Sequence, residues 1–373
     1  MKKFTKGCLM TALVLFLVGL VLSIVCGLLG GFRQLSEMGV SDSSFGLYRD
    51  ADGGWRIGFP WSGHIRDELD DIEDIDVGDM DIGDIDVGDA DIGDIEDIRK
   101  TTGEALERKL KELDGKKEQL ALTADTLGSL EIDVEDCNVL IKESADEYVW
   151  FLAEGSSDKP RYTIENEGGK SRLCIENEVK HHFVRWRNGA KNTAYLWLPK
   201  DCALEECEID MGAGYMSSMF VNARQMKVDL GAGLVETDGF EGEQISILVG
   251  AGELLADRIT AGKADFEIGA GHLRIDELAV SGETDVEVSM GAAELAGTLS
   301  GDLDMECDMG EIVMRLTGSE DDHSYSVECG MGNVTVGNYS HSGLASHKSW
   351  NTGNDSEFDI NCNMGNVTVT FEE

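Results

Sequence analysis

The sequence contains little positive charge and little proline. Its 373 residues include 31 Lys and Arg against 73 Asp and Glu, which gives a formal net charge of −42. Nucleic-acid affinity depends on basic side chains that displace counterions, so a polyanion repels such a chain. The composition therefore excludes nucleic acid as a partner. The three prolines stand against 45 glycines, a balance typical of a repeat protein with many tight turns.

Signatures of catalysis are also missing. The Gly-rich stretches lie between expected strands, and not between a strand and a helix as in a nucleotide-binding loop. No Ser-His-Asp or Cys-His arrangement has a recognisable local signature. Cys202 and Cys207 have neither a second Cys pair nor a His cluster to complete a zinc site. We therefore expect no enzyme, no cofactor and no structural metal.

The chain does contain a degenerate repeat from about Cys207 to Glu373. Its copies read IDMGAGYM, VDLGAGLV, ILVGAGEL, FEIGAGHL, VSMGAAEL, CDMGEIVM, CGMGNVTV and CNMGNVTV. The spacings between the first glycines are 19, 19, 19, 22, 19, 22 and 33 residues. These glycines are Gly212, Gly231, Gly250, Gly269, Gly291, Gly310, Gly332 and Gly365. Such a period predicts a solenoid, in which no single unit can bury its apolar face alone.

Apolar columns lie five, three and one residues before each of these glycines, with mostly polar residues between them. The column nearest the glycine comprises Met211, Leu230, Val249, Ile268, Met290, Met309, Met331 and Met364. Inward columns also include Cys207, Cys307, Cys329 and Cys362, which we expect to act as small apolar core residues. The period-two alternation predicts a strand with one buried face.

After the glycine the apolar parity shifts, so a second strand begins there. The glycines then form the corner between two strands, because glycine accepts unusual backbone angles and allows neighbouring backbones to approach closely. We predict an all-β, single-chain β-solenoid with coils of 19–22 residues, stacked in parallel. An antiparallel meander of the same strands is the alternative.

An apolar run stands at the N-terminal side of the chain. Residues Cys8–Phe32 contain no charged side chain and follow Lys2, Lys3 and Lys6. The run exceeds the ~20 residues that span a bilayer. We predict that residues 1–32 are a retained transmembrane anchor, with a cleaved signal peptide as the alternative. The lysines predict a cytoplasmic N-terminus and an extracellular C-terminal domain.

Three segments separate this run from the repeats. Residues 33–66 are rich in Gly and aromatic side chains and read as a juxtamembrane linker, with contact to lipid headgroups as the alternative. Residues 67–98 contain 16 acidic residues in IDVGD-like pentads, which predicts a self-repelling spacer. Weak calcium binding or a partner-bound β-coil are alternatives for it. Residues 99–125 hold a short helix, Thr101–Asp114, with a leucine stripe.

Residues 126–373 form the last predicted domain. Short alternating segments between residues 127 and 199 read as the first coils or the cap of the solenoid. The opening LEIDVEDCNVLIKES, the segment AYLWLP and the serial MGAG, LGAG, VGAG and IGAG cores resemble the bacterial putative-adhesin β-strand-repeat family, a domain of unknown function. The resemblance implies a β-solenoid displayed at a bacterial surface behind one membrane helix. It offers no catalytic residue to carry over.

One basic cluster, KHHFVRWRNGAK at Lys180–Lys191, interrupts the acidic background. Its candidate ligand-binding residues are His181, His182, Arg185, Trp186 and Arg187. They suit an anionic glycan or a lipid headgroup. The alternative is a hairpin whose cations pair with acidic neighbours. We predict a membrane-anchored, non-enzymatic binding or adhesin-like module with a glycan or protein ligand. The alternative is an accessory or sensor protein in cell-envelope stress signalling.

Overall fold

The structure is a computed structural model that describes residues 46–49, 55–58 and, with gaps, 103–372. The gaps in the last range are residues 104, 111–112, 114, 156–158, 178–191, 343–344 and 355. The predicted anchor and the acidic spacer lie outside the described residues. Among the helices that the structure does describe, none has the length and apolar character of a membrane span.

The chain divides into two compact units, residues 1–88 and 89–373, which we describe separately. In the first unit, β1 (Gly46–Arg49) pairs with β2 (Trp55–Gly58) as an antiparallel hairpin. The hairpin lies within residues 33–66, which the sequence indicates as a linker.

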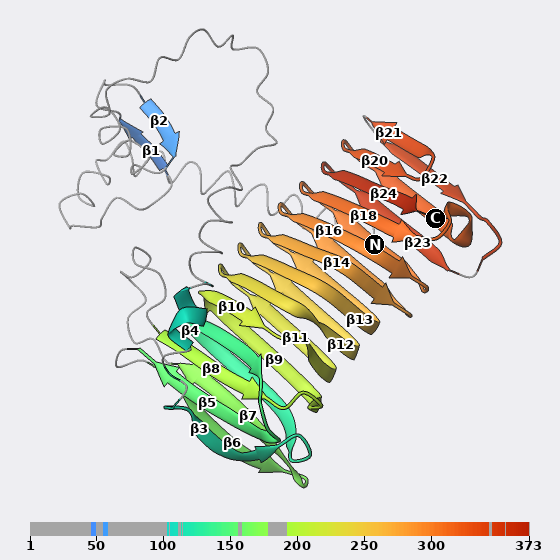
Figure 1. The fold of residues 1–373 in the computed structure, drawn as a ribbon. Helices are drawn as coiled ribbons and strands as arrows, with labels where there is room; N and C mark the ends of the chain where they lie inside the picture. Colours follow the sequence, from blue (N-terminus) through green and yellow to red (C-terminus); the bar gives the residue numbers. More distant parts are fainter. Residues whose placement is uncertain are drawn as a thin grey trace. The chain divides into compact units, whose positions relative to one another are not determined.

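The second unit is a β-solenoid in which strands stack side by side in two parallel faces (Figure 1). In spatial order face A comprises β7 (Lys170–Asn177), the first half of β4 (Leu127–Glu143), β9 (Ala203–Ala213), β11 (Val221–Leu230), the second halves of β12 (Leu234–Val249) and β13 (Glu253–Ile268), β15 (Thr284–Val288), β17 (Leu303–Cys307), β23 (Glu357–Cys362) and β19 (Ser324–Cys329). The predicted parallel stacking is confirmed.

Face B lies on the other side of the core. It comprises β8 (Asn192–Leu198), the second half of β4, β10 (Tyr215–Ser218), the first halves of β12 and β13, β14 (His272–Val280), β16 (Ala292–Leu299), β18 (Glu311–Thr317), β24 (Asn366–Glu372) and β20 (Asn333–Val336). Alternating side chains of both faces, such as Val235, Phe240, Ile247 and Phe266, are fully buried between them. Each such side chain contributes roughly 1.5–3 kcal/mol, so the stacked core holds the coils together.

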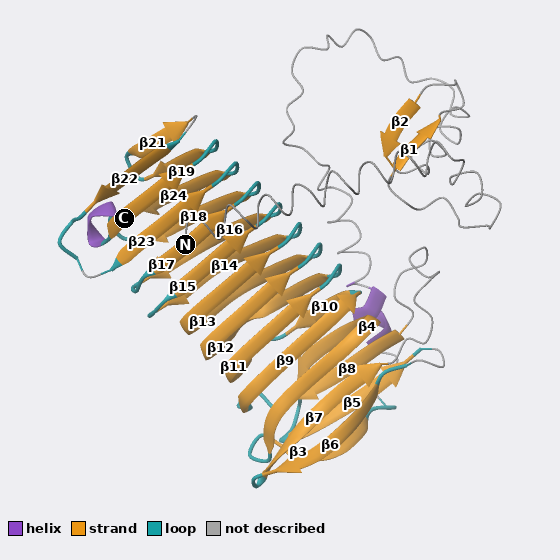
Figure 2. Cartoon of the chain, turned by 180° about the vertical axis from the view of Figure 1, so that it is seen from behind, coloured by secondary structure: helices purple, strands orange, loops and turns teal. Residues whose placement is uncertain are grey.

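Antiparallel strands close both ends of the stack (Figure 2). At one end β6 (Arg161–Glu167) pairs with β7, β5 (Tyr148–Glu154) pairs with β8, and β3 (Glu118–Thr123) pairs with β5. At the other end β22 (Ser346–Trp350) pairs with β19, and β21 (Tyr339–Ser342) pairs with β20. These strands cover the open edges that would otherwise recruit another chain. The antiparallel alternative therefore applies to the caps alone.

The spatial order of the coils differs from their order in the sequence. The coil formed by β23 and β24 lies between the β17–β18 coil and the β19–β20 coil, although it follows both in the chain. Likewise β4 lies between the β7–β8 coil and the β9–β10 coil. The linear order implied by the repeat spacings is therefore wrong at both ends.

All eight predicted glycines lie at the corner, but in two columns instead of one. Gly212, Gly231, Gly250 and Gly269 stack on one another. From the fifth copy on, the predicted glycines stack on the second glycine of the earlier cores, beginning with Gly291 on Gly271. None of the eight has a positive φ, so the corner requires glycine for the close approach of neighbouring backbones.

This two-residue shift corrects the apolar columns. Met211, Leu230, Val249 and Ile268 are buried as predicted, but their partners in the later coils are Val288 and three cysteines. The cysteines are Cys307, Cys362 and Cys329 in spatial order, and all are buried. The four methionines predicted to point inward are instead exposed at the corner.

A short helix packs on the outer side of face B near β4, β8 and β10. Residues 105–110 are helical, within the predicted Thr101–Asp114. Leu106 and Leu113 are buried against Leu140, Tyr195 and Tyr215, which form a second, smaller apolar cluster. The leucine stripe is compatible with either a short coiled-coil seam or a helix packed on the domain, and the structure shows the second. The described part of the second unit is otherwise β-structure and turns, apart from one 3-10 turn at Glu320–Asp322.

Candidate functional site

The outer side of face A carries aligned rows of polar side chains. Strand alternation sends every second residue outward, and the in-register parallel pairing places equivalent residues of neighbouring coils beside one another, ~4.8 Å apart. One such row runs through Glu131, Glu208, Lys227, Ser246 and Asp265. The surface is therefore a grid of side chains fixed by the backbone ladder.

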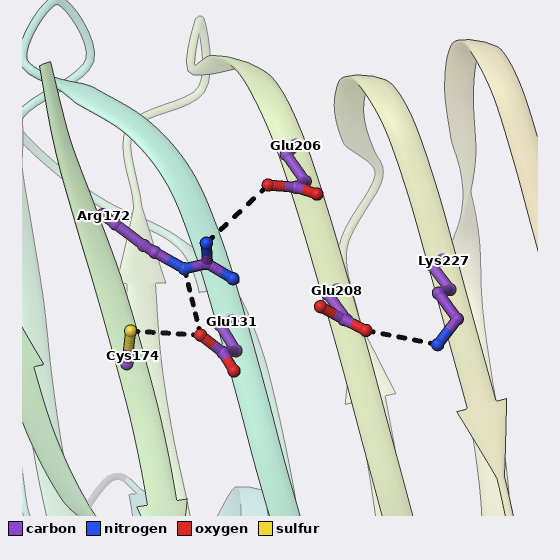
Figure 3. A network of polar contacts seen from close by, with 6 residues as sticks. All are labelled: Glu131, Arg172, Cys174, Glu206, Glu208 and Lys227. Carbon is purple, nitrogen blue, oxygen red and sulfur yellow. Dashed lines mark hydrogen bonds and ion pairs between the residues drawn. The ribbon is translucent and has the colours of Figure 1, made fainter. Parts of the chain in front are cut away.

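Charged side chains connect four coils at the N-terminal part of this grid (Figure 3). Arg172 of β7 donates from Nε to Glu131 Oε2 of β4 at 3.0 Å, and its Nη1 lies 3.9 Å from Glu206 Oε2 of β9. Lys227 of β11 contacts Glu208 at 3.2 Å and Asp229 at 2.8 Å. These pairs are partly exposed, so they orient side chains more than they stabilise the fold.

The ion pairs shift the protonation of their members. Hydrogen bonds to Asp229 and then to Glu208 raise the pKa of Lys227, so its ammonium stays charged. Burial, and a hydrogen bond to Glu131 at 3.2 Å, raise the pKa of the Cys174 thiol. Cys174 is therefore a protonated donor within the network, because a nucleophilic cysteine requires a lowered pKa.

An open groove of about 380 Å³ lies beside this network on β9, β11, β12, β13 and the Glu283–Asp285 segment. Its polar lining comprises Glu206, Glu208, Gln225, Lys227, Gln244, Ser246, Lys263, Asp265, Glu283 and Asp285. Gln225 and Gln244 are paired in register and are exposed. Five carboxylates face two ammonium groups in this lining, so the groove carries net negative charge and disfavours anionic ligands.

From the far end of the groove onward the grid becomes mostly acidic. Asp265, Asp285, Asp304 and Asp359 stand in one row of adjacent coils. Burial, and then the neighbouring carboxylates, raise the pKa of Asp285 and of Asp359. Stacked like charges repel one another, so this row costs the folded state stability. A row of carboxylates that destabilises the fold makes this face a candidate for interaction with ligands.

The described residues contain no group of three or more His, Cys, Asp and Glu side chains placed to hold a metal ion. Cys202 and Cys207 are buried thiols, and burial raises the pKa of each. The grid therefore offers hydrogen bonds and charge, and it lacks an activated nucleophile among the residues described here. Its chemistry suits recognition.

The sequence analysis placed its candidate site elsewhere. The basic cluster at Lys180–Lys191, with His181, His182, Arg185, Trp186 and Arg187, falls between β7 and β8 and lies outside the described residues. The groove residues were not predicted. The signal for them was present in the polar columns between the apolar ones, because Gln225 and Gln244 stand 19 residues apart at equivalent positions of two coils.

The fold and the groove define a capped β-solenoid with an outward-facing polar surface. The chain belongs to the Toastrack DUF4097 family, whose model matches residues 127–370. This family has no known catalytic activity. Among curated proteins none matches the chain.

Solved structures of bacterial proteins provide distant likenesses. A putative cell adhesion protein from Clostridium sporogenes is 12% identical over 69% of this chain and 99% of that chain, with a TM-score of 0.26. A putative adhesin from Parabacteroides merdae is 12% identical over 69% and 97% of the two chains, with a TM-score of 0.30. A putative lipid binding protein from Parabacteroides distasonis is 11% identical over 69% and 96%, with a TM-score of 0.28.

Proposed function

We propose that the solenoid is a non-enzymatic binding module held at the outer surface of a bacterial membrane by the apolar run at residues 1–32. The lysines before that run and its length support this arrangement. External protease should then degrade the solenoid on intact cells. Complete resistance under conditions that cleave a known surface protein would contradict the display.

The groove on face A is the binding surface in this proposal. One observation supports it above the others: amide, hydroxyl, carboxylate and ammonium groups from successive coils line a continuous groove of about 380 Å³. Rows that contain both donors and acceptors at ~4.8 Å spacing suit an extended ligand with many hydroxyl groups. Because carboxylates outnumber ammonium groups in the lining, we infer a neutral or amino-sugar glycan.

Binding of the full-length chain, in detergent, to arrays of neutral, amino-sugar and anionic glycans tests the groove. The double variant Gln225→Ala with Gln244→Ala removes two exposed amides from the lining. We expect it to lose about tenfold or more in affinity, because each amide hydrogen bond is worth ~0.5–1.5 kcal/mol. Gln119→Ala, which removes an exposed amide from β3 in the cap, is the matched control.

The outcome is decisive when both variants melt at the same temperature as the parent chain. Equal glycan binding by parent and double variant would remove the groove from the proposal. Binding to anionic glycans alone would contradict the charge argument and direct attention to the basic cluster at Lys180–Lys191.

A further inference from the structure

The exposed corner of the solenoid carries an unusual column of methionines. Five large hydrophobic side chains are exposed among the described residues, and four of them are methionines of this corner. In spatial order they are Met290, Met309, Met364 and Met331, here called the Met ladder. Their exposed fractions lie between 51% and 61%. Met219 and Phe220, at the turn after β10, are by contrast half-buried.

Backbone hydrogen bonds place these residues on successive coils. The amide of Met309 donates to Ser289 O at 2.9 Å, and the amide of Met364 donates to Asp308 O at 2.7 Å. The amide of Met331 donates to Asn363 O at 2.7 Å. Each bond joins a methionine to the residue that precedes the neighbouring methionine, so the four side chains leave adjacent rungs.

The same column holds alanine in the earlier coils. Ala232, Ala251 and Ala270 make the equivalent bonds to Gly212, Gly231 and Gly250. Folding of the corner therefore does not require a long side chain at this position. Four long, exposed and polarizable side chains in a row point to a role outside the core.

Thioether sulfur is a soft ligand that prefers monovalent soft cations such as Cu(I). Adjacent rungs are separated by ~4.8 Å. Two metal–sulfur bonds of about 2.3 Å, the length known for zinc thiolates, together span nearly that distance. Neighbouring methionines can therefore share one cation without any movement of the backbone. A row of four thioethers also provides each inner methionine with a partner on either side.

The negative charge of the chain favours a bound cation, and the nearby cysteines are not available as competing ligands. A chain with a net charge of −42 concentrates cations at its surface. The cysteines of the same coils, Cys307, Cys362 and Cys329, point inward and are buried. Burial raises the pKa of Cys362 to about 12, so its thiol is protonated at neutral pH. A protonated thiol is a poor metal ligand.

We propose that the Met ladder is a binding site for soft monovalent cations of the Cu(I) and Ag(I) class, with methionine sulfurs of adjacent coils as ligands. The site is independent of the face A groove. It holds the cation between the sulfurs of neighbouring methionines and does not select Ca²⁺, Mg²⁺ or Zn²⁺, which prefer oxygen, nitrogen or thiolate ligands.

Silver(I) is the probe, because it is soft, monovalent and stable in air. The full-length chain, labelled with ¹³C at the methionine methyl groups, is titrated with silver nitrate in chloride-free buffer and detergent. We expect a subset of the 14 methionine signals to shift at substoichiometric to equimolar silver. The variant Met309→Leu with Met364→Leu keeps shape and exposure, so it preserves the fold. We expect it to lower silver affinity at least tenfold.

Met219→Leu is the matched control, since Met219 is half-buried in the turn after β10 and away from the corner. It should bind silver as the parent chain does. A second variant, with Cys307, Cys329 and Cys362 each changed to Ala, should also retain binding. Silver affinity unchanged by the Met309→Leu and Met364→Leu pair would overturn the proposal. So would loss of binding in the Cys variant, or an affinity no greater than that of free methionine.

Discussion

The close approach of backbones at the corner makes a sharp prediction for Gly233, which belongs to the second glycine column. A Cβ atom added at Gly233 would lie 2.6 Å from the carbonyl oxygen of Gly214 in the preceding coil, and 2.8 Å from Met211 Cε. Ordinary van der Waals contact begins at 3.4 Å. An alanine there must separate the two coils locally by about 0.8 Å.

Such a separation breaks hydrogen bonds as well as packing. The amide of Leu234 donates to Gly214 O at 2.9 Å, and an opening of 0.8 Å would extend this to about 3.7 Å, beyond hydrogen-bond range. Loss of that bond costs ~0.5–1.5 kcal/mol. The overpacked corner adds ~1–3 kcal/mol. We therefore expect Gly233→Ala to destabilise the solenoid by roughly 2–4 kcal/mol, or about 4–16 °C in Tm for a domain of this size.

Thermal and urea unfolding of the full-length chain measure this effect. Ala251→Ser is the control, because Ala251 is the exposed middle residue of the next corner and its change should stay within about 0.5 kcal/mol. The reasoning fails if Gly233→Ala and Ala251→Ser unfold at the same midpoint. The reasoning would also fail if the destabilisation came from a restricted backbone angle instead of the added Cβ atom. Gly233 has no positive φ, so alanine can adopt its backbone conformation.

Two further predictions follow from the coil order and from the acidic row. Deletion of residues 357–373 removes the β23–β24 coil from between its neighbours. Limited proteolysis of the truncated chain should therefore digest residues 318–356, while residues 127–317 stay protected. Protection of β19–β22 in the truncated chain would contradict the observed order. Asp285→Asn should raise Tm at pH 7.5, because the raised folded-state pKa of Asp285 means that its ionised form costs stability above that pKa. The gain should shrink as pH falls through the raised folded-state pKa and vanish below 3.8, where the carboxyl becomes protonated in both states. Salt at 0.5 M should also reduce the gain, and a gain that is independent of pH would refute the electrostatic origin.

The sequence predicted the solenoid correctly because period-two alternation and a recurring corner are local signals. Residues such as Val235, Ile247 and Phe266 are buried where the alternation places them. The column of Met290 was misplaced because each repeat was aligned on its first glycine. In the later copies that glycine, such as Gly291 of SMG, corresponds to the second glycine of the earlier GAG cores, so the alignment is shifted by two residues. Alignment of Val288 with Ile268 would have left the methionines outside, as the structure has them.

The coil order and the polar groove were harder to predict. Pairing between β17 and β23 joins segments about 55 residues apart, and no local pattern distinguishes that partner from β19, which carries the same Cys-x-Met-Gly core. The groove likewise depends on which coils are adjacent. Gln225 and Gln244 are ordinary exposed amides until the parallel ladder places them in one row. Such features depend on tertiary pairing, which the repeat period alone does not specify.

The displaced coil also constrains how the nascent chain can fold. The ribosome makes β19 and β20 before β23 and β24, yet in the finished solenoid β23 and β24 separate them from β17 and β18. Until β24 emerges, the strands already made must either leave a rung vacant or pair temporarily with the wrong neighbour. The matching Cys-x-Met-Gly cores make that temporary pairing chemically similar to the final one. Completion of this end of the solenoid is thus a late insertion event, in which β23 and β24 enter between strands that were made before them.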